Sequence, residues 1–451
     1  MTAHPAERVE RAEDPPDPPD APHTSRPDPV DESTGDGADA VAEEETDEAQ
    51  PADAAQPPPE AGRMARWRGR LRWMLAPLGI YAVTRIVQLW LIDWMLPPAA
   101  AVPLTPPATP VRDKLLAWDA VWFVRIAVEG YPRSYQYGPD GKLLGSILAF
   151  FPGYPLLIRL GHAVTRADAG SVAIAIAWIS AAILAVLVCA LGTAMWDRRT
   201  GLVLTALVCT QPMSVVFSMG YSEPVFLMFA VGALLAAYRQ RWILAGVLGL
   251  AAGLTRPTGA AVALALLVAA VMHVSRRANG PRRWWAFAGA ALAATGVPAY
   301  LIWVGLRVGE ASAWFKVQSA GWGTSYDNGA MVLSFIRDAL RTGSGWVDVS
   351  VAWLLLLAAA CAVLAVWLSI EGRVWPPLVV YGLVALTLVV GQAGYYHSKP
   401  RLLVPVLVTL VPPALALGRA RPRTAVAVLL AFGLFGMWYG AYLLTVWRYA
   451  V

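Results

Sequence analysis

The sequence predicts an all-α membrane protein with about eleven transmembrane helices, and three observations support this fold class. Of the 451 residues, 57% are hydrophobic and only 15% are charged, with a mean hydropathy of +0.50. Such values are typical of polytopic membrane proteins. Long apolar runs recur along the chain, and short basic stretches separate many of them. When the runs are threaded through a bilayer, the short basic stretches all fall on one side, as the positive-inside rule requires.

Residues 1–62 form an acidic, proline-rich segment that we expect to be disordered. Residues 1–60 contain 18 acidic and three basic residues, a net charge of −15, and almost no aromatic or large aliphatic side chains. Such a segment cannot bury enough apolar surface to offset the entropy of ordering its chain. We therefore expect a disordered cytoplasmic tail, 1–62, followed by a transmembrane domain, 63–451.

The cationic stretch RMARWRGRLRW (63–73) sets the expected orientation. Its five arginines and two tryptophans directly precede the first apolar run. Basic residues with interfacial tryptophans are typical of the cytoplasmic end of a span. We therefore expect a multi-pass protein of the cell membrane with a cytoplasmic N-terminus. The basic excess after residue 60 fits loops that face anionic lipid, so membrane lipids are expected partners and nucleic acid is not.

Eleven apolar runs follow this anchor, and each is a candidate span. Several are shorter than the roughly 20 residues of a full crossing, so paired runs are expected to form tilted hairpins. Residues 147–162 are a further apolar stretch, which we interpret as re-entrant because an additional span would place the later basic loops outside. The eleven runs are 74–96, 171–195, 201–219, 222–238, 242–254, 257–274, 284–306, 349–369, 376–394, 401–417 and 424–446.

Five polar clusters fall on the extracytoplasmic side in this topology. Charges near a bilayer are costly and tend to mark function, and five independent segments converge on one face. The clusters are the loop with Asp119 and Glu129, GYSEP (220–224), TRPTG (255–259), WFKVQSAGWGTSYDNG (314–329) and YYHSKPR (395–401).

Each of these residues also has a purely structural interpretation. Asp119 could cap the helix predicted for DAVWFVRIA, although the capping-box position holds Trp122 rather than Glu or Gln. Glu223 could be a first-turn carboxylate favoured by the helix dipole. The tryptophans and tyrosines of the outer loops could form a membrane-interface belt. Three cations could simply lie at the interface: Arg256, Lys399 and Arg401.

One carboxylate and several cations on an outer face fit sugar transfer from a lipid phosphate. The acceptor hydroxyl needs a carboxylate base, and the departing phosphate needs Arg or Lys to stabilise its charge. Aromatic rings suit the apolar faces of sugars. A membrane-bound donor requires no nucleotide-binding fold, and no phosphate-loop pattern is found. Neither the three cysteines nor the five histidines have metal-type spacing, so no cofactor is expected, and a bound divalent cation would revise this expectation.

The same motifs resemble a known family. WDAVWFVRIAVEGYP (118–132), AFFPGYPLLIRL (149–160), YSEPVFLMFA (221–230) with TRPTG, and SKPRLLVPVLVTL (398–410) look like the PIG-V-type mannosyltransferases and their bacterial relatives. That family belongs to the GT-C class of multi-spanning glycosyltransferases. The high arginine content of the chain suggests a bacterial member of the family. The resemblance covers about residues 75–445.

The resemblance implies a GT-C-like bundle whose first outer loop carries short helices. It also implies an inverting transfer of mannose, or a similar hexose, from a polyprenyl-phosphate-linked donor to an extracytoplasmic glycolipid, glycan or protein. Asp119 matches the family's essential aspartate and is the expected general base. Arg256, Lys399 and Arg401 are expected to bind the donor phosphate. Four residues are expected to shape the sugar or acceptor site: Trp118, Trp122, Glu223 and His397.

A polytopic transporter or lipid-linked sugar flippase is the alternative function. Transporters usually place polar residues near the membrane midplane, with repeated halves. We find neither an internal repeat nor midplane charge pairs, apart from Arg85 in the first run. A continuous central polar path would favour transport. An outer cavity that unites the carboxylates with Arg256 and Arg401 would favour the enzyme.

Overall fold

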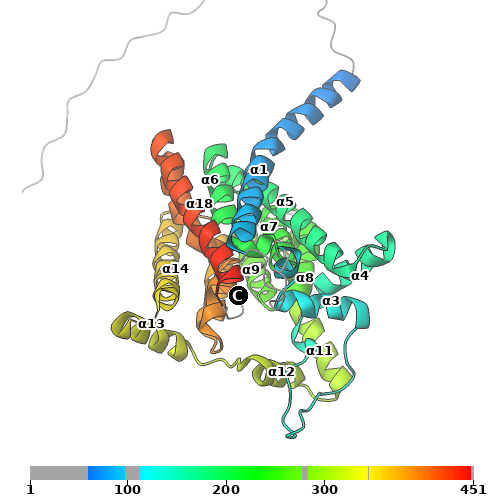
Figure 1. Cartoon of the computed structure of the whole chain (residues 1–451). Coiled ribbons are helices and arrows are strands. Elements are labelled where there is room, and N and C mark those ends of the chain that lie inside the picture. The colour runs from blue at the N-terminus through cyan, green and yellow to red at the C-terminus, as the bar shows by residue number, and fades with distance from the viewer. Residues whose placement is uncertain (1–58, 97–110, 277–282, 344, 448–451) are drawn as a thin grey trace, which may run out of the picture. The chain divides into compact units, whose positions relative to one another are not determined.

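The computed structural model describes residues 59–96, 111–276, 283–343 and 345–447, and within these ranges it contains helices but no strands (Figure 1). This confirms the all-α fold class. Most of the acidic tail and the proline-rich loop 97–110 lie outside the described residues. The first helix, α1 (Pro59–Met95), begins four residues before the predicted boundary at residue 63. Proline suits a first helical position because its missing N–H has no partner there in any case.

Among the described residues, five helical stretches are long and apolar enough to cross a membrane. Each coincides with a predicted run, so the prediction of a membrane protein is confirmed, while its topology and orientation stay predictions. The stretches are Arg72–Met95 of α1, α5 (Ala169–Met195), α10 (Arg283–Ala294) continued by α11 (Gly296–Val308), α14 (Trp346–Ile370) and α18 (Pro422–Thr445).

The other six runs are also helical but shorter or broken. The tenth run bends by 70° between Tyr396–Leu403 and Leu407–Arg419, and Pro405 stands in the break, where it cannot donate to a continuing helix. The elements are α6 (Arg198–Thr210), α7 (Glu223–Tyr238), α8 (Trp242–Thr255), α9 (Gly259–Arg276), α15 (Pro376–Val390), and, in the bent run, η3 (Tyr396–Ser398), α16 (Lys399–Leu403), η4 (Leu407–Leu410) and α17 (Val411–Arg419).

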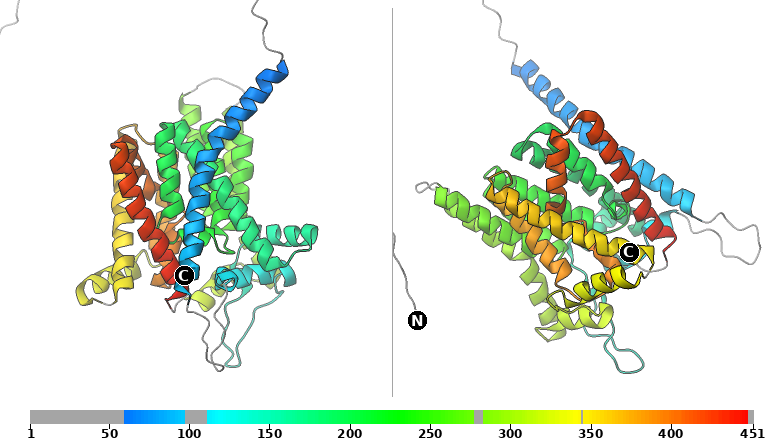
Figure 2. Two further views of the ribbon diagram at one scale, coloured as in Figure 1. Left: turned by 45° about the horizontal axis from the view of Figure 1, so that its top comes forward. Right: turned by 90° about the vertical axis from the view of Figure 1, so that its left-hand side faces the viewer.

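The first loop carries short helices, as expected. They are α2 (Val111–Leu115), α3 (Asp119–Glu129), η1 (Ile147–Ala149) and α4 (Gly153–Thr165). Residues 147–162 are therefore divided between η1 and α4, and the 13 residues of α4 reach only about 20 Å, too short for a full span. Instead, α4 contacts α3 and α5. Two more short helices, α12 (Ala313–Trp322) and α13 (Ala330–Thr342), lie at the same end of the bundle as α3 (Figures 1 and 2).

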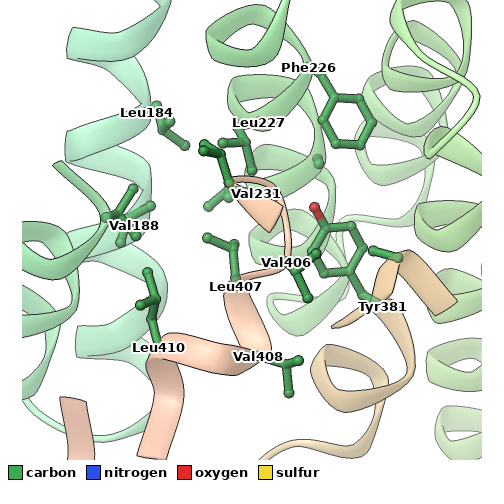
Figure 3. Close-up of a cluster of buried hydrophobic side chains, with 14 of the residues drawn as sticks. Leu184, Val188, Phe226, Leu227, Val231, Tyr381, Val406, Leu407, Val408 and Leu410 are labelled. Atoms are coloured by element: carbon green, nitrogen blue, oxygen red, sulfur yellow. The ribbon is translucent and has the colours of Figure 1, made fainter. Parts of the chain in front are cut away.

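Close packing against the bent run fixes the position of α16. A Cβ added to Gly382 of α15 would lie 2.2 Å from Cβ of Val408, so only glycine permits this approach. The hydroxyl of Tyr381 donates to the carbonyl of Pro405 at 2.8 Å and satisfies a backbone group in the break. Figure 3 shows the surrounding apolar side chains, among them Leu184, Val188, Phe226, Leu227, Val231, Val406, Leu407 and Leu410.

A buried arginine of α1 supports the break between α6 and α7, where η2 (Ser214–Phe217) interrupts the helices. Nη2 of Arg85 donates to the Cys209 carbonyl at 2.6 Å, and Nη1 donates to the Ser214 carbonyl at 2.7 Å. Non-helical backbone at membrane depth needs such partners because lipid offers none. Arg85 therefore stabilises the irregular segment that leads into α7.

Candidate functional site

Asp119 begins α3 and meets Arg401 of α16. Nη1 of Arg401 donates to Oδ2 of Asp119 at 2.6 Å, and the two side chains are only 11% and 22% exposed, respectively. A short, charge-assisted contact with little solvent around it is stronger than a surface ion pair. The first loop and the tenth predicted run, separated by 282 residues, therefore meet at this contact.

The capping interpretation of Asp119 is wrong. The N-cap of α3 is Trp118, which makes no side-chain capping bond, and the Asp119 carboxylate accepts from Arg401. The backbone of Trp118 has φ 59° and ψ −120°, a conformation that residues with a side chain rarely adopt. Such strain costs about 1–3 kcal/mol and is concentrated at functional sites.

Glu223 is fully buried between two guanidinium groups. Its Oε1 lies 2.8 Å from Nη1 of Arg256 and 3.6 Å from Nε of Arg401. Nη1 of Arg256 also donates to Oγ of Ser222 at 2.9 Å. A buried carboxylate is tolerated only when cations or hydrogen bonds compensate it. Together with Asp119, these side chains form an alternating series, Asp119–Arg401–Glu223–Arg256, which we call the charge chain.

Helix ends place all four members of the charge chain. Asp119 and Glu223 are the first residues of α3 and α7, where the helix dipole favours a carboxylate. Arg256 is the C-cap of α8, and Arg401 lies in the short helix α16. Because these four helix ends converge, the side chains meet without any long loop between them.

Tyr221 is a further residue of this network. Its ring lies under the Arg401 guanidinium, 5.2 Å from ring centroid to Cζ, and its hydroxyl accepts a long hydrogen bond of 3.4 Å from the Asp119 amide. Burial raises the pKa of the Tyr221 hydroxyl, and the nearby Asp119 carboxylate raises it further. Tyr221 is therefore a neutral partner that orients both the cation and the start of α3.

A cavity of about 180 Å³ adjoins the charge chain. Asp119, Arg256, Lys399 and Arg401 all line it, so the structure brings these four predicted residues together. Aromatic side chains supply much of the remaining wall, namely Phe123, Phe150, Phe151, Trp314, Trp322 and Tyr395.

Lys399 reaches this cavity from a buried position. Its Nζ donates to the carbonyl of Val389 at 2.8 Å and to the carbonyl of Gln392. An ammonium group has three protons, so one remains for another acceptor. Lys399 thus joins α16 to the end of α15 and can still contribute charge to the cavity.

Four other predicted residues do not line the cavity. Trp118 and Trp122 are 40% and 37% exposed and are not among the residues that line the cavity. The His397 ring lies 5.3 Å from the Tyr395 ring at an interplanar angle of 33°. Glu223 contacts both arginines but is not among the residues that line the cavity. The roles of these four in binding sugar or acceptor stay predictions.

An apolar groove of about 680 Å³ continues from the cavity. Arg256, Trp314, Gln318 and Gln392 are among the residues that line both. Farther along, the wall is largely apolar and includes Val297, Leu301, Leu388 and Pro405. The cavity and the groove therefore adjoin each other, and Arg256 is the one charged side chain among the described residues that line both.

The sequence interpretation missed the aromatic wall and Tyr221. These residues all belong to stretches that the sequence had singled out, but no single-residue signal distinguished them. The stretches are WDAVWFVRIAVEGYP, AFFPGYPLLIRL, GYSEP, the polar cluster 314–329 and YYHSKPR. Within the described ranges, no group of three His, Cys, Asp or Glu side chains is placed to hold a metal ion.

Residues 108–278 match the family model described as Mannosyltransferase (PIG-V), which confirms the predicted resemblance over that stretch. It contains Asp119, Glu223 and Arg256 but not Lys399 or Arg401. No curated protein matches the chain.

Several solved structures are similar to this chain at low identity. ArnT from Cupriavidus metallidurans in the apo state is 14% identical, with a TM-score of 0.46, over 78% of this chain and 62% of ArnT. The apo oligosaccharyltransferase of Archaeoglobus fulgidus is 13% identical, with a TM-score of 0.45, over 82% of this chain and 56% of its own. AglB of the same organism, in complex with an inhibitory peptide and a dolichol-phosphate, is 13% identical, with a TM-score of 0.42, over 81% of this chain and 55% of AglB. This chain therefore spans little more than half the length of most of these proteins.

Proposed function

We propose that this protein is a membrane glycosyltransferase that transfers mannose, or a similar hexose, from a polyprenyl-phosphate-linked donor to an extracytoplasmic glycolipid, glycan or protein. The observation that carries the proposal is the contact between Asp119 and Arg401 inside a cavity that opens into an apolar groove. The family match over residues 108–278 supports the same reaction class.

Asp119 is suited to act as the general base of this reaction. Arg401 donates to Oδ2 of this carboxylate, and no hydrogen bond to Oδ1 is found among the described residues. In the proposed step, the acceptor oxygen attacks the anomeric carbon while its proton passes to Asp119. The bond from the anomeric carbon to the phosphate oxygen breaks, and the phosphate leaves with the electron pair. A single displacement of this kind inverts the anomeric configuration.

The three cations of the site are suited to bind the leaving phosphate and stabilise its charge. Arg256 lies at the junction of the cavity and the groove, where a phosphate attached to an apolar chain would lie. Arg401 has five N–H donors and can engage both Asp119 and a phosphate oxygen. Lys399 supplies one further N–H. Charge that develops on the phosphate is thereby stabilised in a site with little solvent.

The transport alternative has less support. The cavity unites Asp119, Arg256 and Arg401, three of the four residues expected together for the enzyme, while Glu223 contacts both arginines without lining the cavity. The buried Arg85 serves backbone carbonyls, so it marks no polar path.

The direct test supplies the purified protein, in liposomes, with synthetic polyprenyl-phosphate-mannose labelled in the sugar and with membrane lipid or protein fractions as the source of acceptor. Release of polyprenyl phosphate together with a glycosylated product of inverted configuration is the expected result. Movement of the intact donor between leaflets without cleavage would replace this proposal with the flippase alternative.

A further inference from the structure

A second large cavity lies at the far ends of the helices that lead to the charge chain. α7 runs from Glu223 to Tyr238, and α8 returns from Trp242 towards Arg256. Tyr238 and Trp242 line this second cavity, which has a volume of about 660 Å³. The 16 residues of α7 place it about 24 Å from Glu223. The proposed transfer reaction does not use it.

The wall of this cavity combines aromatic rings with cationic or titratable nitrogen groups and contains no carboxylate. The described residues that line it include Arg373 and His273 but no Asp or Glu. The His273 ring lies 5.2 Å from that of Trp242. Four large aromatic side chains complete this lining: Trp196, Tyr238, Trp242 and Trp375. A cavity of this composition favours an anionic group.

Arg373 is held so that its guanidinium remains available. Nε1 of Trp196 donates to the Arg373 carbonyl at 2.8 Å, which fixes the backbone of the turn after α14. The guanidinium has one long contact, 3.3 Å to Glu371, and both side chains are more than one-third exposed. An ion pair this exposed contributes little to stability. Because a guanidinium has five N–H donors, an anion in the cavity can engage those that Glu371 does not contact.

Partly exposed apolar and aromatic side chains are among the residues that line this cavity. Ile370, at the end of α14, lines the cavity and is 79% exposed. Tyr238, which also lines the cavity, is 36% exposed and packs edge-to-face against Trp375. Partly exposed Trp and Tyr beside aliphatic residues are typical of the head-group level of a membrane. A ligand with an anionic head and an apolar tail matches both the nitrogen groups of this lining and its exposed apolar residues.

We propose that this cavity binds the phosphate head group of a phospholipid. Arg373 contacts the phosphate, the aromatic wall encloses the head group, and the acyl chains leave past Ile370. This site is separate from the charge chain and does not depend on the proposed transfer activity.

Binding of dihexanoylphosphatidylglycerol to the delipidated full-length protein in detergent, measured by native mass spectrometry, tests the proposal. We expect saturable binding of one molecule. Arg373→Gln should weaken it at least about tenfold, because a charge-assisted hydrogen bond is lost, whereas Arg373→Lys should retain most of it. Arg239→Gln is the matched control, because Arg239 is an exposed arginine near the same end of α7 but does not line the cavity.

Glycerol 3-phosphate carries a phosphate but no acyl chains, so it distinguishes a site for a phospholipid head group from a site for a free phosphate compound. If it binds as tightly as the lipid, the phosphate site stands and the lipid source is refuted. Equal weakening by Arg239→Gln and Arg373→Gln would reduce the effect to surface charge and overturn the site. Absence of saturable binding for both compounds would also overturn it.

Discussion

Glu223 touches both arginines of the site while remaining fully buried and outside the cavity, so it acts on Arg401 and Arg256 from behind. The two cations that line the cavity are thus held by a carboxylate that does not line it. Asp119 is the carboxylate on the cavity side. The two acidic residues of the charge chain therefore have different expected phenotypes.

Asp119→Asn should abolish transfer without unfolding the protein. The amide keeps the shape and can still accept from Arg401, but it cannot take the acceptor's proton, and general-base catalysis contributes roughly 10²–10⁴-fold. The release rate of polyprenyl phosphate should fall at least about 100-fold. Asp113→Asn, an exposed neighbour outside the cavity, should keep the parent rate. A fully active Asp119→Asn protein would refute the assignment.

Glu223→Gln should lower stability far more than loss of an exposed ion pair. Removing one partner of a buried pair costs about 3–5 kcal/mol, because the remaining charge is left uncompensated. The control is Glu129→Gln, which breaks a pair of the same 2.8 Å length with Arg125 whose side chains are about half exposed. That change should cost at most about 0.5 kcal/mol. Thermal unfolding in detergent compares the two, and equal shifts in Tm would contradict the role given to Glu223.

Charge removal at the donor site should weaken use of the donor. Arg256→Gln, Arg401→Gln and Lys399→Met should each raise KM for polyprenyl-phosphate-mannose, with a smaller effect at Lys399, because backbone carbonyls already engage two of its protons. Initial rates over a range of donor concentrations provide the values. Parent-like KM values in all three variants would leave these cations as interfacial anchors.

Two glycine substitutions should separate close helix contacts from helix propensity. A Cβ on Gly436 of α18 would lie 2.0 Å from the Thr210 carbonyl oxygen, whereas a Cβ on Gly79 of α1 meets nothing within 4 Å. Gly436→Ala should therefore destabilise the protein, while Gly79→Ala should be neutral or stabilise it by up to about 1 kcal/mol. Thermal unfolding of the two variants checks this, and the reverse order would contradict the observed packing.

A chain that starts at Arg63 should insert and transfer sugar like the full chain, because the composition of residues 1–62 cannot support a packed core. Membrane fractionation and the transfer assay measure the two properties separately. Normal insertion with lost transfer would assign the tail a part in catalysis.

The sequence predicted the helices better than their breaks. Apolarity and length located all eleven runs, but the 70° bend of the tenth run and the interruption by η2 depend on tertiary partners. The Tyr381 hydroxyl donates to the carbonyl of Pro405 in the bend, and Arg85 donates to carbonyls on both sides of the end of α6. Pro405 and Pro212 mark the two breaks locally. Neither Tyr381 nor Arg85 is near in sequence to the backbone that it supports, so local patterns could not reveal how the freed carbonyls are satisfied.

The same limit applies to the site. Topology alone predicted that Asp119, Arg256, Lys399 and Arg401 would converge, because their segments end on one side of the membrane. The separation of Glu223 from the cavity depends instead on the direction of one side chain at a helix end. The position of Tyr221 likewise depends on the loop before α7, which only the folded chain defines.

The short helices between the two cavities have a consequence for the surrounding bilayer. α7, α8 and α15 contain 16, 14 and 15 residues, so each reaches only about 21–24 Å, several ångströms less than an average hydrocarbon core of roughly 30 Å. A membrane adapts to such a mismatch by thinning locally. Only the part of these helices that faces outward can act on lipid, and α8 has such a face at Ile243, Leu244 and Val247. Under the proposed function, thinning beside α8 would bring the head-group layer closer to the level of Arg256, where the donor phosphate is proposed to bind.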